Sequence, residues 1–221
     1  MNSSLIPGTP AGDTFQFERM LRKRGFVHIA GTDEAGRGPL AGPVVGAAVI
    51  LPHHCDYTLF CDSKQTTEKQ RYHLRDIMHR IGAKIGTGIV SAETIDSINI
   101  LQASLLAMKQ AIGALTESAG KPDFILVDGK QQLPLQTPQE ALVKGDARSA
   151  SIGAASIIAK ILRDEIMTEL HHRHPAYNFI GNKGYPTAEH RRIIEAIGPS
   201  PAHRFSFKGV REFVKNTDRS R

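Results

Sequence analysis

Short apolar runs alternate with amphipathic segments along most of the chain. Apolar runs of strand length occupy residues 27–30, 44–51, 84–90, 124–127 and 141–143. Helical periodicity predicts helices over residues 14–23, 68–81, 149–170, 188–197 and 205–214, and an apolar stripe at Leu101, Leu105, Met108, Ile112 and Leu115 predicts one more. This alternation is typical of an α/β domain, in which ligands collect where strands end.

The pattern divides the chain into three parts. Residues 1–13 contain Pro7, Gly8, Pro10 and Gly12, which favours a disordered leader. Residues 14–170 carry the alternating pattern and form the predicted main domain. After the long helix the pattern changes, and residues 171–221 are predicted to form a small helical appendage.

Two adjacent carboxylates, Asp33 and Glu34, lie between the first two apolar runs and are followed at once by Gly36-Arg37-Gly38. Adjacent carboxylates repel each other and lose solvation on burial, so we expect a hard cation such as Mg²⁺ or Mn²⁺ to hold them. The glycines also fit the dinucleotide-binding fingerprint loosely, but that fingerprint needs a helix next, and the strand-like run 44–51 follows instead. A turn that brings backbone close to a sugar-phosphate chain is the better interpretation.

Two further carboxylates, Asp128 and Asp146, follow the apolar runs 124–127 and 141–143. Three of these acids also have a plain structural interpretation: Asp128 could serve a turn, Asp146 could cap the next helix, and Asp33 could pair with Arg37. All four, however, fall where strands of one sheet would end. Because neighbouring strand residues face opposite sides, Asp33 and Glu34 share a site only if the strand has ended or bulged there. Four acids around two cations would suit phosphodiester hydrolysis.

The charge balance favours a polyanionic partner. The chain has 28 lysines and arginines against 22 acidic residues, a formal net charge of +6. A basic surface around an acidic pocket suits a nucleic acid held by metal at the reacting point, although a basic protein without such a partner has the same composition.

The cysteines, the histidines and the lengths of the apolar runs limit the possible cellular compartments and metal sites. The two cysteines, Cys55 and Cys61, match no zinc spacing and favour a reduced, cytoplasmic compartment. The three histidines within residues 171–174 are interpreted as a basic helix end rather than a zinc site. No apolar run approaches the roughly 18 residues of a membrane helix, and no signal-peptide core follows the first residues.

At this point the chain resembles a known family, type 2 ribonuclease H, and within it bacterial ribonuclease HII. The resemblance covers about residues 26–208, with its motifs in family order. They are Asp33-Glu34-Ala35-Gly36-Arg37-Gly38, Asp62-Ser63-Lys64, Val127-Asp128-Gly129, Lys144-Gly145-Asp146, Ala154-Ala155-Ser156-Ile157-Ile158-Ala159-Lys160 and Lys183-Gly184-Tyr185-Pro186-Thr187.

The resemblance implies a ribonuclease H-like mixed sheet flanked by helices, with a small C-terminal helical segment. It implies Mg²⁺- or Mn²⁺-dependent cleavage of the RNA strand of RNA/DNA hybrids and incision 5′ of single ribonucleotides in duplex DNA, leaving 3′-OH and 5′-phosphate ends. Removal of ribonucleotides and of primer RNA would be its roles. The sequence does not fix the oligomeric state, but nothing in it suggests an obligate dimer, so we expect a monomer.

The resemblance also assigns residues. Asp33, Glu34, Asp128 and Asp146 match the metal-binding, catalytic carboxylates, which implies two ions. Gly36, Arg37 and Gly38 match the turn that reads the ribose 2′-OH, the group that distinguishes RNA from DNA. Tyr185 matches the tyrosine that packs on the neighbouring sugar, and Lys64 a lysine that contacts the substrate backbone. Two positions depart from the family pattern: Asn182 replaces a more common His, and Gly153 replaces a common Ala.

Two other functions fit parts of the pattern. One is a non-catalytic nucleic-acid-binding module whose acids are structural. The other is a different nuclease or resolvase on the same type of fold. Loss of activity with EDTA would exclude the first, and a requirement for one ribose would exclude the second.

Overall fold

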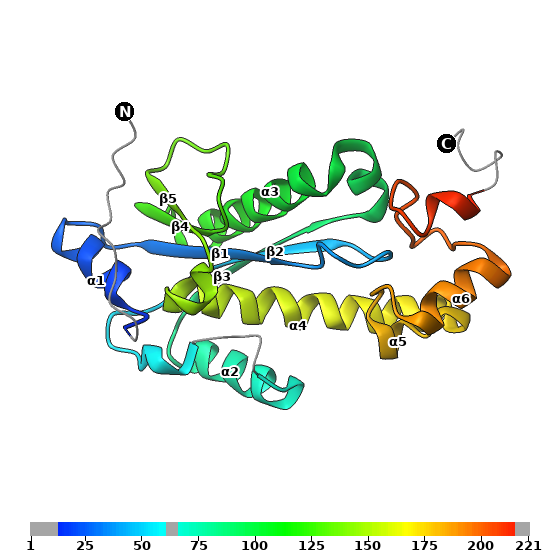
Figure 1. Cartoon of the computed structure of the whole chain (residues 1–221). Helices are drawn as coiled ribbons and strands as arrows, with labels where there is room; N and C mark the ends of the chain where they lie inside the picture. The colour runs from blue at the N-terminus through cyan, green and yellow to red at the C-terminus, as the bar shows by residue number, and fades with distance from the viewer. Residues whose placement is uncertain (1–12, 61–65, 215–221) are drawn as a thin grey trace.

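Five strands form one mixed sheet in the computed structural model, which describes residues 13–60 and 66–214. The sheet order is β3-β2-β1-β4-β5 (Figure 1). The strands are β1 (Ile29–Ala35), β2 (Val44–Ile50), β3 (Lys84–Val90), β4 (Phe124–Asp128) and β5 (Gln139–Leu142). Strand β1 is antiparallel to β2, and β2 to β3, whereas β4 runs parallel to both β1 and β5. The predicted α/β fold with a mixed sheet is confirmed.

Helices cover both faces of this sheet, with α3 on one side and α4 on the other (Figure 1). Helix α2 packs on α4, and α1 precedes β1. The helices of this part are α1 (Gln16–Lys23), α2 (Glu68–Arg80), α3 (Ala92–Ala119) and α4 (Ala150–Arg173), with short 3₁₀ turns η1 (Tyr57–Phe60) and η3 (Gly145–Ala147). Local signals fix several helix starts, because Thr67 forms a capping box with Gln70 and the Ser149 hydroxyl accepts the Ile152 amide.

Close backbone approach lets α3 lie flat on the sheet. A Cβ added at Gly46 would lie 2.4 Å from the Ala107 carbonyl carbon, and one at Gly88 would lie 2.3 Å from the Ala107 oxygen. Among the helices described, α3 is the one that is long and apolar enough, by length and composition, to cross a membrane. Its apolar face packs on β2 and β3, which is the behaviour of a core helix.

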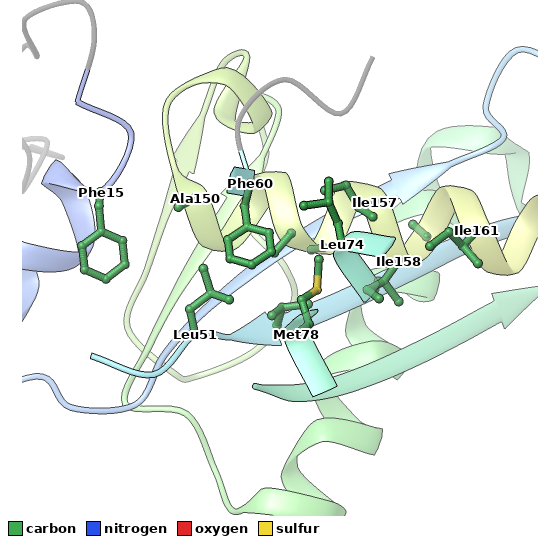
Figure 2. Packing of buried hydrophobic residues seen from close by; sticks show 14 residues of the cluster. Phe15, Leu51, Phe60, Leu74, Met78, Ala150, Ile157, Ile158 and Ile161 are labelled. Carbon is green, nitrogen blue, oxygen red and sulfur yellow. The ribbon is translucent and has the colours of Figure 1, made fainter. Parts of the chain in front are cut away.

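The largest apolar cluster lies between the sheet, α2 and α4 (Figure 2). It contains Phe60 from η1, Met78 from α2 and Ile157 from α4, all shielded from solvent. Phe15 stacks on Tyr57 at the same end, with ring centroids 3.5 Å apart. This cluster anchors α4, and with it the loop that carries Asp146.

The C-terminal segment contains α5 (Phe179–Asn182), α6 (Ala188–Ile197) and the 3₁₀ turns η4 (Pro175–Tyr177) and η5 (Arg211–Phe213). The helix predicted over residues 205–214 was wrong, because this stretch forms turns and ends in η5. The amides of Phe205 and Ser206 both donate to the Asp96 carboxylate of α3, which fixes the start of this stretch. Gly209 also takes a positive φ of 92°, which interrupts a helix.

This segment packs against the loop after β1 and against α4. The shared cluster includes Leu40 from the loop, Met167 from α4, and Phe179 and Ile194 from the C-terminal part. Helix α4 itself runs past residue 170 to Arg173. The division of the chain at residue 171 therefore stays a prediction, and the leader 1–13 lies almost wholly outside the described residues.

Candidate active site

Strand β1 carries both Asp33 and Glu34, so the prediction that the apolar run 27–30 ends before them was wrong. Pairing with β2 extends the strand, with Asp33 opposite Ala47 and Glu34 opposite Gly46. Asp33 is buried, and its Oδ1 accepts the Glu34 amide at 2.7 Å. Strand β1 ends only one residue further on, at Ala35.

Two neighbouring clefts meet at these acids. One has a volume of about 440 Å³ and is lined by Asp33, Glu34, Asp128 and Tyr185 among others. The other has a volume of about 380 Å³ and is lined by Glu34, Asp128 and residues of α3. Glu34 and Asp128 line both clefts, whereas Asp33 lines only the first. The adjacent acids therefore share one cleft although a strand carries both.

Asp128 ends β4, the strand parallel to β1, whose Val127 lies opposite Thr32. Its Oδ1 accepts a 2.6 Å hydrogen bond from the Gly145 amide. This bond ties the end of β4 to the loop that carries Asp146. Asp128 thus does more than close the turn at Gly129, which was its alternative interpretation.

The three carboxylates of the first cleft perturb one another. Burial raises the pKa of Asp33 well above its ordinary value, and the charges of Glu34 and Asp128 raise it further. Burial also raises the pKa of Glu34, with Arg37 acting against it and Asp128 adding to it. Since like charges resist joint ionisation, a cation placed among them would relieve both the desolvation and the repulsion.

Glu34 has one engaged oxygen and one without a partner. Arg37 Nη1 donates to Glu34 Oε1 at 3.1 Å. The alternative interpretation, in which Arg37 pairs with Asp33, was therefore wrong. Glu34 Oε2 is buried and accepts no hydrogen bond from the described residues. An orphaned carboxylate oxygen beside two other carboxylates suits a hard, oxygen-liganded cation such as Mg²⁺ or Mn²⁺.

Asp146 stands slightly apart. It lies in η3 and is buried, and it lines neither cleft. It is not the cap of α4, because Ser149 caps that helix. Within residues 13–60 and 66–214, no three His, Cys, Asp or Glu side chains are already arranged to hold a metal ion. The structure thus brings Asp33, Glu34 and Asp128 together and connects Asp146 to them through the Gly145–Asp128 bond.

The turn and the tyrosine predicted to read the substrate lie against each other. Gly36 takes a positive φ of 98°, and a Cβ on Gly38 would lie 3.7 Å from Tyr185 Cε1. Tyr185 is 44% exposed, so its ring is available to a ligand. Arg163 places its guanidinium carbon 5.8 Å from the centroid of that ring. Lys64, the other predicted substrate contact, lies outside the described residues.

Basic side chains that we did not single out complete the first cleft. They are Arg71, Lys160 and Arg163, of which Arg71 and Lys160 both contact the buried Asp164 carboxylate. Lys160 belongs to the motif in α4, but helical spacing alone could not place it beside the acids. Arg163 and Arg204 were also missed, because a buried arginine that binds only carbonyls leaves no pattern in one sequence.

The two departures from the family pattern are accommodated locally. Asn182 is buried, donates to the Tyr177 carbonyl at 2.7 Å and accepts the Gly184 amide at 2.7 Å, so it shapes the turn before Tyr185. A Cβ on Gly153 would lie 1.9 Å from the Phe60 carbonyl oxygen. The position of η1 therefore requires glycine in this chain.

Comparisons with known proteins agree with this arrangement. The fold is similar to the crystal structure of ribonuclease H2 from Pyrococcus horikoshii OT3, with a TM-score of 0.68 and 26% identity over 88% of this chain and 100% of that one. A structure of Bst-RNase HIII in complex with Mn²⁺ has a TM-score of 0.65 at 17% identity and covers 84% of this chain and 68% of that one, which bears on the fold alone. Fold and acidic cleft together define a nuclease of the ribonuclease H class.

Sequence comparison makes the assignment specific. The family model described as Ribonuclease HII matches residues 30–210. The ribonuclease HII of Desulfotalea psychrophila is 55% identical over 202 residues, 91% of this chain and 90% of that protein. That of Geobacter sulfurreducens is 47% identical over 214 residues, 97% of each. The chain belongs to the ribonuclease HII family, and it is an endonuclease that cleaves RNA in RNA/DNA hybrids and at ribonucleotides embedded in DNA.

Proposed function

We propose that the protein incises duplex DNA on the 5′ side of a single ribonucleotide, leaving 3′-OH and 5′-phosphate ends, and degrades the RNA strand of longer hybrids by the same chemistry. Asp33, Glu34, Asp128 and Asp146 would hold two Mg²⁺ or Mn²⁺ ions. Bound there, such ions would activate water and stabilise the leaving oxygen. The observation that carries the proposal is the buried Glu34 oxygen without a hydrogen-bond partner, in a cleft where the charges of neighbouring carboxylates raise the pKa values of Asp33 and Glu34.

The protein's own groups have separate tasks. The carboxylates would hold the cations, which would supply positive charge beside the reacting phosphate. Basic side chains of the first cleft, Arg71, Lys160 and Arg163, favour a phosphate backbone beside the acids. The turn Gly36-Arg37-Gly38 and the exposed ring of Tyr185 stand on the same side and are the groups that would read the 2′-OH and the neighbouring sugar. Lys64 belongs to the same proposal as a backbone contact.

The proposal also covers the substrates, the cellular roles, the location and the oligomeric state. RNA/DNA hybrids and ribonucleotide-containing duplex DNA are the proposed partners, and removal of ribonucleotides and primer RNA the proposed roles. A cytoplasmic location and a monomeric state complete the proposal.

A labelled duplex with one ribonucleotide tests it directly. We expect a single cut 5′ of the ribose with 3′-OH and 5′-phosphate ends in Mg²⁺ or Mn²⁺, and no product in EDTA. Replacing the ribose by deoxyribose should abolish cutting. Cutting of the all-DNA duplex would indicate a structure-selective nuclease, and binding without metal-dependent cutting would indicate a binding module.

A further inference from the structure

Two arginines, Arg163 and Arg204, are almost fully buried, and their side chains donate to backbone carbonyls. Arg204 is completely buried, in the segment predicted as an appendage. Its guanidinium donates to four carbonyl oxygens of one loop: Gly36 at 2.5 Å, Arg37 at 3.0 Å, Gly42 at 3.0 Å and Pro43 at 3.2 Å. A buried cation needs such partners, and a planar guanidinium can reach several at fixed angles.

The main chain around Arg204 binds the same loop. The Arg204 amide donates to the Leu40 carbonyl at 2.8 Å, and the Gly42 amide donates to the Ala202 carbonyl at 2.8 Å. Ala41 and His203 form an isolated antiparallel bridge between them. Residues 202–204 therefore hold both ends of the segment from Gly36 to Pro43.

Peptide geometry then determines which way the neighbouring backbone amides point. In a trans peptide the carbonyl of one residue and the amide of the next point opposite ways. With the Gly36 and Arg37 carbonyls both on Arg204, the Arg37 and Gly38 amides point away from it together. In the part of the chain that the structure describes, neither amide donates a hydrogen bond to the protein, and both residues are exposed. Successive amides that point to the same side can together bind an anion or another acceptor oxygen.

We propose that Arg204 is a positioning residue for the reaction: it turns the Gly36 and Arg37 carbonyls inward, so that the Arg37 and Gly38 amides face the sugar-phosphate of the substrate. This inference rests on the proposed function of the turn. It gives the C-terminal segment a task in recognition, because that segment supplies the side chain that sets the turn. Arg204 itself does not touch the substrate.

Arg163 binds a different part of the same loop, so its contacts can be distinguished from those of Arg204. Its donors reach the carbonyls of Ala41, Pro43 and Lys183, at 3.3, 3.2 and 3.0 Å, and none reaches the Gly36 or Arg37 carbonyl. It thus joins the end of the loop to the turn before Tyr185. Of these two arginines, Arg204 is the one that holds the two carbonyls that orient the recognition amides.

The test compares Arg204→Lys with Ile194→Ala. A lysine keeps the charge but cannot span four carbonyls, so the turn should lose its fixed orientation. Ile194 lies in the C-terminal apolar cluster and has no group that could donate to the turn, so Ile194→Ala controls for lost stability. Thermal melting of each variant establishes that it is folded. Fluorescence anisotropy in EDTA gives the dissociation constants for a duplex with one ribose and for the same duplex in all-DNA form.

We expect the parent protein to prefer the ribose-containing duplex, and Arg204→Lys to lose that preference and to cleave about 30- to 100-fold more slowly, the effect of losing one or two hydrogen bonds to a charged group. Ile194→Ala should keep the preference. A preserved preference and rate in Arg204→Lys, or an equal loss in Ile194→Ala, would overturn the inference. A parent protein that binds and cuts both duplexes equally would instead remove the proposed function.

A second measurement uses the unaltered protein. In ¹⁵N spectra the Arg37 and Gly38 amide signals should shift on binding the ribose-containing duplex, while the Arg204 side-chain N–H signals stay protected from exchange with solvent. Amide signals that do not respond, or rapid exchange at the Arg204 side chain, would contradict the inference even if the lysine variant does not fold.

Discussion

The backbone amide of Gly145 donates a 2.6 Å hydrogen bond to Oδ1 of Asp128. The contact joins two segments that are 17 residues apart in the chain. It fixes the Asp128 carboxylate at the end of β4 and holds the η3 turn, with Asp146, next to the acids of β1. One neutral donor thus positions two of the four predicted carboxylates.

Replacing Asp128 by Asn should separate chemistry from binding and stability. The amide oxygen can still accept the Gly145 amide, so the loop should stay in place, but one negative charge of the proposed metal site is lost. We expect the single-turnover rate to fall at least about 100-fold, with the dissociation constant for uncleaved substrate changed little.

The same variant should melt higher than the parent in metal-free buffer. The Asp128 charge raises the pKa values of Asp33 and Glu34, so removing it relieves repulsion in the folded state, by about 1 kcal/mol. Calorimetry in EDTA measures the difference. Near-normal cleavage by Asp128→Asn would contradict the assignment of Asp128 to the proposed metal site.

Tyr185→Ala should impair incision at a lone ribonucleotide. The exposed ring faces the Gly36–Gly38 turn, and its loss removes an apolar surface for a sugar, so we expect kcat/KM to fall about tenfold or more. Tyr185→Phe keeps the ring and is the matched control. Equal rates for the alanine variant and the parent on this substrate would refute the role.

Gly153→Ala should destabilise the fold. The new methyl group would meet the Phe60 carbonyl oxygen at 1.9 Å, so η1 or α4 must shift, at a cost of about 1–3 kcal/mol. Gly113→Ala in α3 is the control, because a Cβ there meets nothing within 4 Å and alanine favours a helix. Urea unfolding should show opposite signs for the two variants, and equal effects would contradict the steric explanation.

Acid should weaken the C-terminal segment through His203. Its Nδ1 is 3.0 Å from the Ser200 amide, and its Nε2 is 3.0 Å from His190 Nε2. Burial, with His190 nearby, lowers the pKa of His203 from 6.5 to about 3. Between pH 6.5 and about pH 3, His203 is therefore protonated in the unfolded chain and neutral in the folded protein. Stability is full above pH 6.5 and falls as pH drops, by about 2 kcal/mol at pH 5.

A difference measurement isolates that effect from the acids, whose raised pKa values act in the opposite direction. The free energy of unfolding of His203→Gln, measured from pH 7 to pH 5, should fall less steeply than that of the parent. His73→Gln, which removes an exposed histidine of α2, should keep the parent slope. Parallel curves for His203→Gln and the parent would show that His203 is not the sensor.

Local signals allowed much of the fold to be predicted. Period-two and helical patterns with capping residues placed β3 and α6 at their observed bounds and α2 within one residue. Two predictions failed. Tertiary pairing with β2 carries β1 through Asp33 and Glu34, and Gly209, inside the helix predicted over residues 205–214, takes a positive φ of 92° that interrupts it.

The site residues also divide into those that the sequence pattern indicates and those that only the folded structure reveals. The acids and the Gly36–Gly38 turn stand out in the sequence because buried charge and glycine have few structural uses. Arg204 does not, because its partners are carbonyls 161 to 168 residues away in the chain, and a carbonyl belongs to every residue type. The metal-binding roles of the four acids and the substrate contacts stay predictions.

The most direct measurement is the single-turnover cleavage rate of a duplex with one ribonucleotide, as a function of Mg²⁺ concentration, for the parent and for Asp146→Asn. Asp146 lines neither cleft, so it is the acid whose membership in the site is least evident from its surroundings. If four carboxylates share the ions, the variant cuts at least about 100-fold more slowly and more Mg²⁺ does not restore the rate. A parent-like Mg²⁺ profile for Asp146→Asn would contradict the four-carboxylate site.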